Sequence, residues 1–431
     1  HAVGLVEDEG LDLVQLDDLL THEVPQAARR RDKDVRAALD RLDLRHLRNA
    51  AEDDRRRHRH IARILADVLV DLERKLARRG EDERTDAAAR VLVQALNNRH
   101  GERAGLARAG LCAAEQIASL TGAAPSEVIF TSGATEANNL AIKGIAQAAR
   151  HIGRHIISTP LEHSSVSGTL TALQEQGYEI DLLDVKQDGT VDLEHLKDLL
   201  RPDTICVAVT LVDSELGVVQ PVQEIAAILK AYPHCHLHVD ATQAVGKIPV
   251  SFEGVDTMSL TAHKFYGLNG IGLLVKRRNL ALEPLIHGGE STTIYRSGTP
   301  TVALASSLAC ALDFAVTDLP GRVGHVAKLN AELRAALSTY PLVRINSPEH
   351  AIPHVLNLSV RNVKGTVFQR ELDAKGVCVS VKSACSSDGL PSRAVFAVSR
   401  DRRNALSSWR ISLSHLTTED EIKAFLQAFD V

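Results

Sequence analysis

Residues 127–144 read EVIFTSGATEANNLAIKG, and their order of apolar, small and helix-forming residues decides the fold class. The run EVIFT at 127–131 is short and mostly apolar, which predicts a buried strand. Small residues follow at 132–135, and EANNLAIKGIAQAAR at 136–150 has the apolar spacing of a helix. The stretch therefore predicts a strand, a turn and a helix, the unit from which parallel α/β sheets are built.

The same alternation continues along the middle of the chain. Helix-period segments such as PVQEIAAILKAY at 221–232 separate further short apolar runs, so we expect a mostly parallel, doubly wound sheet. The runs that predict buried strands are RHIIST at 154–159, EIDLLDV at 179–185, TICVAVTLV at 204–212, HLHVDA at 236–241 and TMSLTA at 257–262.

The C-terminal part has a different pattern. A long helical stretch at 301–340 precedes shorter predicted strands, HVLNLSV at 354–360, VCVSV at 377–381 and WRISLS at 409–414. These predict a smaller α+β domain. We expect a large domain at residues 105–318 and a small C-terminal domain at residues 319–431.

Residues 1–104 differ in composition from the rest. They are rich in Arg, Asp, Leu and Ala, and residues 1–103 contain no Phe, Tyr, Trp, Met, Cys or Ser. The stretch VRAALDRLDLRHLRNAAEDD predicts charged helices. Its basic runs are interleaved with acids, which favours a solvated helix face over a nucleic-acid surface. We expect an atypical Arg/Asp-rich helical segment here.

Composition and charge exclude several classes of protein. The chain has 431 residues and a formal net charge of -5, so nothing in its overall charge favours nucleic acid or membrane surfaces. No apolar run approaches the roughly 20 residues that a bilayer span needs. The first residues, HAVGLVEDEG, carry acids where a signal peptide carries bases, so a cytoplasmic location is expected. The six cysteines form no C-x-x-C pair and are interpreted as free thiols.

The turn at 132–135 is a candidate anion site. Its small residues place bare backbone N–H groups and the Thr135 hydroxyl at a helix N-terminus, where the helix dipole favours phosphate. An ordinary capped helix, with Thr135 near the N-cap and Glu136 behind it, explains the stretch equally well. The stretch is neither a Walker A loop nor G-x-G-x-x-G, so no nucleotide is implied.

Asp240 comes at the carboxyl end of a predicted strand, where open α/β sheets bind ligands. Its alternative role is to cap a helix that begins near Thr242. Alternation also places His234, His236 and His238 on the face of Asp240, which suggests zinc. Ligands two apart on one strand seldom close a tetrahedron, so no metal site is predicted.

Lys264 follows the next predicted strand and precedes a glycine-rich turn. Alone, it is best explained as an exposed loop charge. Beside an anion site and a strand-end aspartate, it becomes a candidate Schiff-base lysine. Phosphate site, ring-nitrogen partner and lysine are the three features that pyridoxal 5'-phosphate (PLP) needs from a protein.

Eight motifs in order resemble those of a known family from about residue 105 to the C-terminus. They are SGATEANNLAIKG, EHSSV, SELGVVQP, VDATQAVG, TAHKFYGLNGIG, RSGTPT, SACSS and WRISLS. Together they resemble the PLP-dependent cysteine desulfurases of the NifS/IscS group, in the class V aminotransferase branch of fold type I. Residues 1–103 do not resemble the family, and we expect this segment to be foreign to it.

The resemblance implies a role for each matching residue. Lys264 corresponds to the lysine that forms the aldimine with PLP, Cys385 to the sulfur nucleophile, and Arg410 to the arginine that binds the substrate carboxylate. His163 corresponds to the imidazole stacked on the cofactor ring. The implied phosphate contacts are Ala134, Thr135, Thr261, His263 and, from a second subunit, Thr299. Asp240 corresponds to the partner of the ring nitrogen and Gln243 to the residue at the phenolic oxygen. Ser214 stands at a position that contacts cofactor and substrate.

Cys385 lies in SVKSACSSDG at 380–389, where small polar neighbours would not bury it. Lys382 is close enough in sequence to favour the thiolate. A flexible loop would also suit a thiol that carries sulfur from the cofactor to an acceptor.

The implied activity is that of a cysteine desulfurase, which mobilises sulfur from L-cysteine as a persulfide on Cys385 and releases L-alanine. Alternatives are a selenocysteine lyase, a class V aminotransferase, and a catalytically impaired PLP-fold protein that acts as a binding partner. The resemblance also implies a homodimer and a sulfur-acceptor protein, such as an iron–sulfur cluster assembly scaffold or a tRNA-modification protein.

Two motifs depart from the family pattern. The chain has DSE at 213–215 where the family typically has Asn-Asn-Glu, so Ser214 stands at the position of an asparagine. HGGESTTIYRSGT at 287–299 lacks the family's GGGQERG before the shared RSGT.

Overall fold

The computed structural model describes residues 113–119, 121–289, 293–298, 301–382 and 390–429. All of them belong to a unit that spans residues 99–431. The segment 1–112 lies outside the described residues, so its predicted helices are not tested. The same holds for Thr299 and Cys385.

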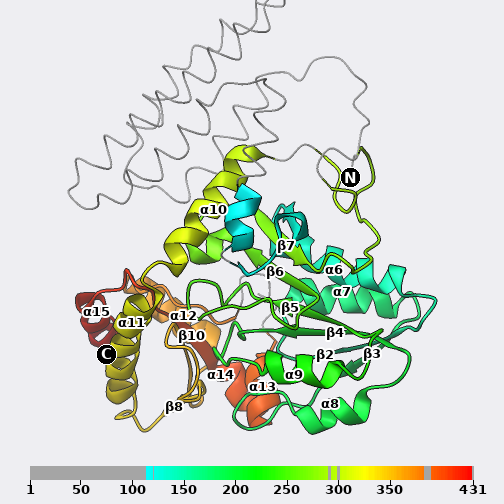
Figure 1. Cartoon of the computed structure of the whole chain (residues 1–431). Helices are drawn as coiled ribbons and strands as arrows, with labels where there is room; N and C mark the ends of the chain where they lie inside the picture. Colours follow the sequence, from blue (N-terminus) through cyan, green and yellow to red (C-terminus); the bar gives the residue numbers. More distant parts are fainter. Residues whose placement is uncertain (1–112, 120, 290–292, 299–300, 383–389, 430–431) are drawn as a thin grey trace, which may run out of the picture. The chain divides into compact units, whose positions relative to one another are not determined.

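A seven-stranded sheet forms the centre of this unit (Figure 1). Its strand order is β1-β7-β6-β5-β4-β2-β3. The strands are β1 (Val128–Thr131), β2 (His155–Ser158), β3 (Glu179–Leu182), β4 (Thr204–Thr210), β5 (His236–Asp240), β6 (Thr257–Thr261) and β7 (Gly272–Lys276).

The sheet is mostly parallel, as the alternation of strands and helices predicted. The pairs β3–β2, β2–β4, β4–β5 and β5–β6 are parallel. Strand β7 is antiparallel to both β6 and β1. Crossover helices connect the parallel strands. They are α6 (Ala134–Ala148), α7 (Ser164–Gln174), α8 (Leu193–Leu199) and α9 (Val222–Leu229).

Alternate residues of β4 show that the sheet is covered on both faces. Cys206 and Ala208 pack in a cluster with apolar residues of α6 and α7, whereas Val207 and Val209 pack in another with residues of α9 and α10 (Val302–Val316). All seven residues of β4 are buried. This two-sided burial is the doubly wound arrangement.

A three-stranded antiparallel sheet, in the order β10-β9-β8, forms a second core. The fully buried Trp409 stacks on Phe368, with ring centroids 5.0 Å apart, and Phe425 and Phe429 pack beside it. The elements are α11 (Leu319–Leu337), β8 (Val343–Ile345), β9 (Val355–Val360), α12 (Gly365–Ala374), α13 (Arg393–Ser399), α14 (Arg402–Ser407), β10 (Ser408–Ser412) and α15 (Glu419–Phe429).

Two sequence predictions for this part were wrong. The stretch 377–381 is not a strand, because only Ser380 pairs, in an isolated bridge with Arg410. The helical stretch 301–340 is broken into α10 and α11 at Asp318, whose φ of 52° is in the left-handed region. The predicted domain boundary falls at this break, and the division into 105–318 and 319–431 stays a prediction.

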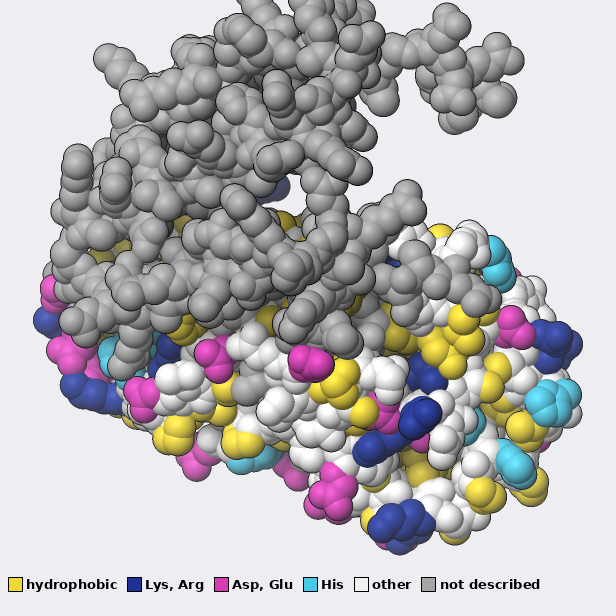
Figure 2. Space-filling model, turned by 45° about the horizontal axis from the view of Figure 1, so that its top comes forward, with side chains coloured by type: hydrophobic (Ala, Val, Ile, Leu, Met, Phe, Trp, Pro, Cys, Tyr) yellow, Lys and Arg dark blue, Asp and Glu magenta, His cyan; other side chains and the backbone are white. Residues whose placement is uncertain are grey.

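Among the described residues, no single helix has both the length and the apolar composition to cross a membrane, although α10 and α11 together pass that test across a 67° bend. On the described part of the face in Figure 2, acidic and basic side chains are intermixed and form no patch of one sign.

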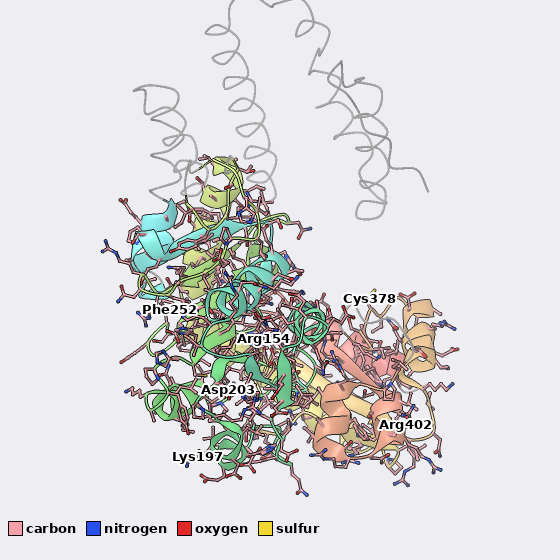
Figure 3. The ribbon with its side chains drawn as sticks, turned by 90° about the vertical axis from the view of Figure 1, so that its right-hand side faces the viewer. Arg154, Lys197, Asp203, Phe252, Cys378 and Arg402 are labelled. Atoms are coloured by element: carbon pink, nitrogen blue, oxygen red, sulfur yellow. The ribbon has the colours of Figure 1, made fainter. Side chains whose placement is uncertain are left out.

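The described cysteines are free thiols, as predicted. Cys206 and Cys235 are buried, and burial raises the pKa of both thiols, which makes them poor nucleophiles. Cys378 is exposed and lies among the elements of the C-terminal part, apart from Phe252 (Figure 3).

Gly272 lets β7 pass directly beneath the turn that precedes α6. A Cβ at this position would lie 2.6 Å from Gly133 Cα and 2.8 Å from the Leu260 carbonyl oxygen. Both are backbone atoms and cannot rotate away. The absence of a side chain at Gly272 therefore sets how closely the start of α6 approaches the sheet.

We expect Gly272→Ala to destabilise the protein by about 3 kcal/mol, because the added methyl group displaces backbone atoms. Gly168→Ala is the matched control. Gly168 lies within α7 with no atom near its Cβ position, so alanine there should stabilise the helix by about 0.5–1 kcal/mol. Urea unfolding of both variants measures the difference. Equal stabilities would contradict the close approach.

Candidate functional site

The predicted site residues gather at one edge of the large sheet. β5 ends at Asp240 and β6 at Thr261, and these two parallel strands are neighbours. His163 precedes α7 in the loop that follows β2. Carboxyl ends of parallel strands are where open α/β sheets bind ligands, so the topology alone brings these side chains together.

Both carboxylate oxygens of Asp240 are engaged. Oδ1 accepts the Thr242 backbone N–H at 2.9 Å, and Oδ2 accepts Nδ2 of Asn138 at 2.8 Å. The side chain is 4% exposed. Turns rather than a helix follow at residues 242–247, so Asp240 does not cap a helix there, and its carboxylate is held rigidly at the strand end.

Asn138 of α6 is the centre of a buried hydrogen-bond network. Its Nδ2 donates to Asp240 and to Ser165 Oγ at 2.8 Å each. Its Oδ1 accepts from Ser259 Oγ and lies 3.0 Å from His238 Nε2. The sequence analysis missed Asn138, although its place one turn into the helix after the predicted anion site was a signal.

His238 is a structural member of this network and not a metal ligand. Its Nδ1 lies 2.9 Å from Thr257 Oγ1, so both ring nitrogens have partners. Burial lowers the pKa of His238 to about 4, and the ring is neutral. The described residues hold no cluster of His, Cys, Asp and Glu suited to a metal ion.

His163 caps α7 and faces the site with a neutral ring. Its Nδ1 accepts the Ser165 backbone N–H at 3.1 Å and lies 2.9 Å from Ser165 Oγ. Burial lowers the pKa of His163, and the charges of Lys264 and Arg393 lower it further, against the opposing effect of Asp240. Because Nδ1 accepts these hydrogen bonds, the ring proton is placed on Nε2.

The start of α6 meets the end of β6 in an arrangement that suits phosphate. Ala134 and Thr135 form the first turn, whose N–H groups have no partner within the helix. A Cβ at Gly133 would lie 3.8 Å from Thr261 Oγ1, which lies 3.2 Å from His263 Nδ1. The N–H groups around this bare glycine fit an anion, although the Thr261 hydroxyl already donates to the Ile271 carbonyl oxygen at 3.0 Å.

An ion pair supports this turn. Glu136 Oε2 accepts the Ser132 backbone N–H at 2.7 Å, and Oε1 accepts Nε of Arg296 at 2.9 Å. Burial raises the pKa of Glu136, but the hydrogen bonds from Arg296 and Ser132 outweigh it, so the net shift is downward. Glu136 therefore supports the turn. The N-cap of α6 is Gly133 without a side-chain cap, so the alternative of an ordinary helix capped near Thr135 was wrong. Arg296 is a further residue that the sequence analysis missed.

Lys264 lies in the short 3-10 helix η4 (Ala262–Phe265), directly after β6, and is exposed. Its charge lowers the pKa values of His163, His263 and Lys247. Lys264 is therefore within electrostatic reach of the residues around Asp240.

Gln243 is held by a lysine that the sequence analysis missed. Lys247 Nζ donates to Gln243 Oε1 at 2.6 Å. Burial lowers the pKa of Lys247 to about 7, and the charges of Lys264 and Arg410 act in the same direction. The spacing of four residues between Gln243 and Lys247 was the available signal.

Arg410 of β10 reaches the site from the small sheet. Its guanidinium donates to the Ser214 carbonyl oxygen, so Ser214 contributes its backbone rather than its hydroxyl here. Arg410 Nε is buried and has no hydrogen-bond partner among the described residues. An unpaired buried guanidinium N–H is costly, and a carboxylate ligand would satisfy it.

Two carboxyl groups flank this arginine. Burial lowers the pKa of Arg410, whereas Glu215 and Asp213 raise it. Burial raises the pKa of Asp213 to about 7 and also raises the pKa of Glu215, although the charge of Arg410 lowers both. The guanidinium is therefore only partly balanced by neighbouring charge.

The described residues just before Cys385 pair with Arg410, although Cys385 itself lies outside the described residues. Ser380 exchanges two backbone hydrogen bonds with Arg410. Lys382, the last described residue before the gap, lowers the pKa of Glu215. Thr299 also lies outside the described residues. Arg296, three residues before it, forms an ion pair with Glu136 in the first turn of α6.

Glu162 is a buried carboxyl group beneath the site. Its Oε1 accepts Thr159 Oγ1 and the Thr210 N–H at 2.8 Å each. Burial raises the pKa of Glu162 to about 8, and the charges of Asp240 and Asp213 raise it further. The group therefore binds a proton at neutral pH.

Comparison with known proteins gives one consistent result. The family model described as "Aminotransferase class-V" matches residues 90–425. "Cysteine desulfurase IscS" of Dictyoglomus turgidum is 38% identical over 323 residues, which are 74% of this chain and 82% of that protein. "NifS/IcsS protein homolog" of Lactobacillus delbrueckii is 37% identical over 322 residues, 73% of this chain and 84% of that protein.

A solved structure titled "NIFS-LIKE PROTEIN" superposes with a TM-score of 0.73 at 33% identity. The match covers 80% of this chain and 94% of that chain. These findings bear out the fold and the family resemblance, whereas the roles of individual residues stay predictions.

We expect Asn138→Ala to destabilise the protein by about 3 kcal/mol, because Asp240, Ser165 and His238 each lose a buried partner. Asn139→Ala is the matched control, since the Asn139 side chain only donates to the Thr135 carbonyl oxygen at an exposed site. Urea unfolding measures both variants. A loss below about 1 kcal/mol for Asn138→Ala would show that the network is not cooperative.

We expect Glu162→Gln to flatten the dependence of stability on pH. Folded Glu162 keeps its proton up to about pH 8, whereas the ordinary pKa of this group is 4.5. Between these values the folded state binds more protons than the unfolded state, so stability falls as pH rises, by up to about 1.4 kcal/mol per pH unit. Urea unfolding at about pH 5.5 and 7.5 tests this linkage. An unchanged slope in the variant contradicts the assignment.

Proposed function

The chain belongs to the class V aminotransferase family, among the cysteine desulfurases of the NifS/IscS group, and on that basis we propose that it converts L-cysteine to L-alanine and transfers the sulfur to Cys385. The observation that carries the proposal is the position of Asp240, whose carboxylate is held rigidly at a strand end. Asp240 and Lys264 are both close enough to His163 to shift its pKa, Asp240 upward and Lys264 downward.

PLP is the cofactor of this family, and it supplies an electron sink that stabilises negative charge at the substrate Cα. The residues present suit it. The first turn of α6, with Ala134, Thr135, Thr261 and His263, would hold its phosphate. Thr299 would add a contact from a second subunit.

The ring of the cofactor has three further proposed partners. Asp240 is an acceptor fixed at both oxygens, which suits a protonated ring nitrogen. His163 presents a neutral imidazole that can lie against the ring and hold a proton at Nε2. Gln243 would donate to the phenolic oxygen.

Arg410 is proposed to bind the carboxylate of L-cysteine through its unpaired Nε–H. Ser214 positions the guanidinium through its carbonyl oxygen. Lys264 Nζ is the proposed attachment point of the cofactor and the base that removes the substrate Cα proton.

Cys385 is proposed as the nucleophile. Its thiolate attacks the substrate sulfur, the substrate C–S bond breaks, and a sulfur–sulfur bond forms. The electron pair of the broken bond stays on the substrate carbon, which takes up a proton as alanine forms. Cysteine and the enzyme thiol thus become alanine and an enzyme persulfide.

We also propose a homodimer, a cytoplasmic location, and a sulfur acceptor of the iron–sulfur scaffold or tRNA-modification class. The homodimer and the sulfur acceptor follow from the family and from no described surface, whereas the location is the expectation from the composition of the sequence. A selenocysteine lyase, a class V aminotransferase and a catalytically impaired binding protein are the alternatives that the following experiment separates.

The PLP-loaded protein should release alanine from L-cysteine and form a persulfide. We expect Lys264→Ala to lower the rate by at least about 10³-fold and Cys385→Ser to abolish sulfur transfer, because each removes a reacting group. Cys378→Ser is the matched control. Cys378 is an exposed thiol that precedes Cys385 in the sequence, and its loss should leave the parental rate unchanged. Alanine and persulfide are quantified together.

Each contrary outcome identifies an alternative. A PLP-bound protein that forms no alanine is a binding protein. Alanine formation that persists at the parental rate in Cys385→Ser shows that Cys385 is not the sulfur acceptor. Consumption of cysteine only when a 2-oxo acid is added identifies an aminotransferase. A strong preference for selenocysteine over cysteine identifies the lyase.

A further inference from the structure

Lys247 is a lysine of the site to which the proposed reaction gives no role. It lies in the turns after β5, four residues beyond Gln243, and is half-buried. Its Nζ donates to Gln243 Oε1 at 2.6 Å, a short hydrogen bond for this pair of groups. Gln243 is the residue proposed to contact the phenolic oxygen of PLP.

The chemistry of the two side chains fixes how Gln243 is oriented. A primary amide has an accepting oxygen on one side and a donating nitrogen on the other. An ammonium group can only donate, so it must bind the oxygen. With Oε1 held by Lys247, the Nε2 hydrogens of Gln243 point to the opposite side.

We propose that Lys247 is a positioning residue that holds the amide of Gln243 so that its N–H groups face the phenolic oxygen of the cofactor. This inference rests on the proposed function, because it assumes that Gln243 contacts PLP. Lys247 itself touches neither cofactor nor substrate. Its charge also adds to that of the surrounding cations and favours the anionic form of the phenolic oxygen.

The groups packed around Lys247 support this role. Lys264 from η4 and Arg410 from β10 are the charges that lower its pKa, after burial. His354, which precedes β9, has a pKa lowered to about 4, by burial and then by the charge of Lys247, and is neutral. Asp213 and Glu215 act on Arg410 rather than on Lys247.

The fixed orientation depends on protonation of Lys247. A neutral amine can accept a hydrogen bond from Gln243 Nε2. The side-chain amide can then rotate so that its oxygen and nitrogen exchange places. With a pKa of about 7, the orientation is fixed below that pH and is lost above it. An anionic ligand in the site raises this pKa and extends the range.

The test compares Lys247→Met and Lys247→Arg with the parent protein. The readouts are the equilibrium affinity for PLP and the pH titration of the visible absorption of the PLP-loaded protein without substrate. We expect Lys247→Met to weaken PLP binding about tenfold and to move the titration midpoint upward by about one pH unit, because a nearby positive charge and a fixed donor are lost. Lys247→Arg keeps the positive charge and a donor to Gln243, so its titration midpoint should equal that of the parent protein.

Lys276→Met is the matched control. Lys276 is a buried lysine at the opposite end of the sheet, where its Nζ donates to the Arg277 carbonyl oxygen at 3.0 Å. This variant should leave PLP affinity and the titration midpoint unchanged. Thermal unfolding of each variant confirms that it folds, and Lys247→Gln is a second neutral variant of similar shape.

Combination with Gln243→Leu separates an indirect role from a direct one. This comparison uses PLP affinity, because the effect of the Lys247 charge on the titration midpoint is direct. If Lys247 acts through Gln243, Lys247→Met adds no further loss of affinity in the Gln243→Leu background. Additive effects would overturn the proposal. So would a Lys247→Met protein with parental affinity and midpoint. A parent protein that binds no PLP would instead overturn the proposed function, and this inference with it.

Discussion

The hydrogen bonds of one buried amide, Asn138, hold the functional edge of the sheet together. From α6 it reaches Asp240 on β5, Ser259 on β6 and Ser165 on α7. Buried polar networks are stabilising only when every member has a partner, so the positions of these elements are mutually dependent. The Asn138 side chain and the Thr242 backbone N–H together fix the orientation of the Asp240 carboxylate.

The sequence predicted elements whose signal is local. Short apolar runs predicted six of the seven strands of the large sheet, because burial of a strand on both faces favours apolar residues at successive positions. They did not identify β7 as a strand or predict its antiparallel pairing, which depends on distant partners. At 377–381 the alternation was present, but only Ser380 found a partner strand.

The same distinction applies to the site. Asp240 and Lys264 could be predicted because each follows an apolar strand, a position that itself favours ligand binding. Asn138 and Lys247 had only a weak local signal, a spacing of three or four residues from a predicted site residue. Asn138 bonds with residues about 100 positions away, and its sequence neighbourhood is that of any amphipathic helix. Glu162 likewise has no local sign that it is buried and protonated.

The charges around the site couple its occupancy to its stability. Burial and the charges of Lys264 and Arg410 lower the affinity of Lys247 for protons, so these like charges repel one another in a site without an anion. An anionic ligand relieves this repulsion and stabilises the folded state by mass action. Asp213, where the family has asparagine, adds a group that ionises near pH 7. Above that pH its charge balances part of the charge of Arg410, and the attraction for a substrate carboxylate declines.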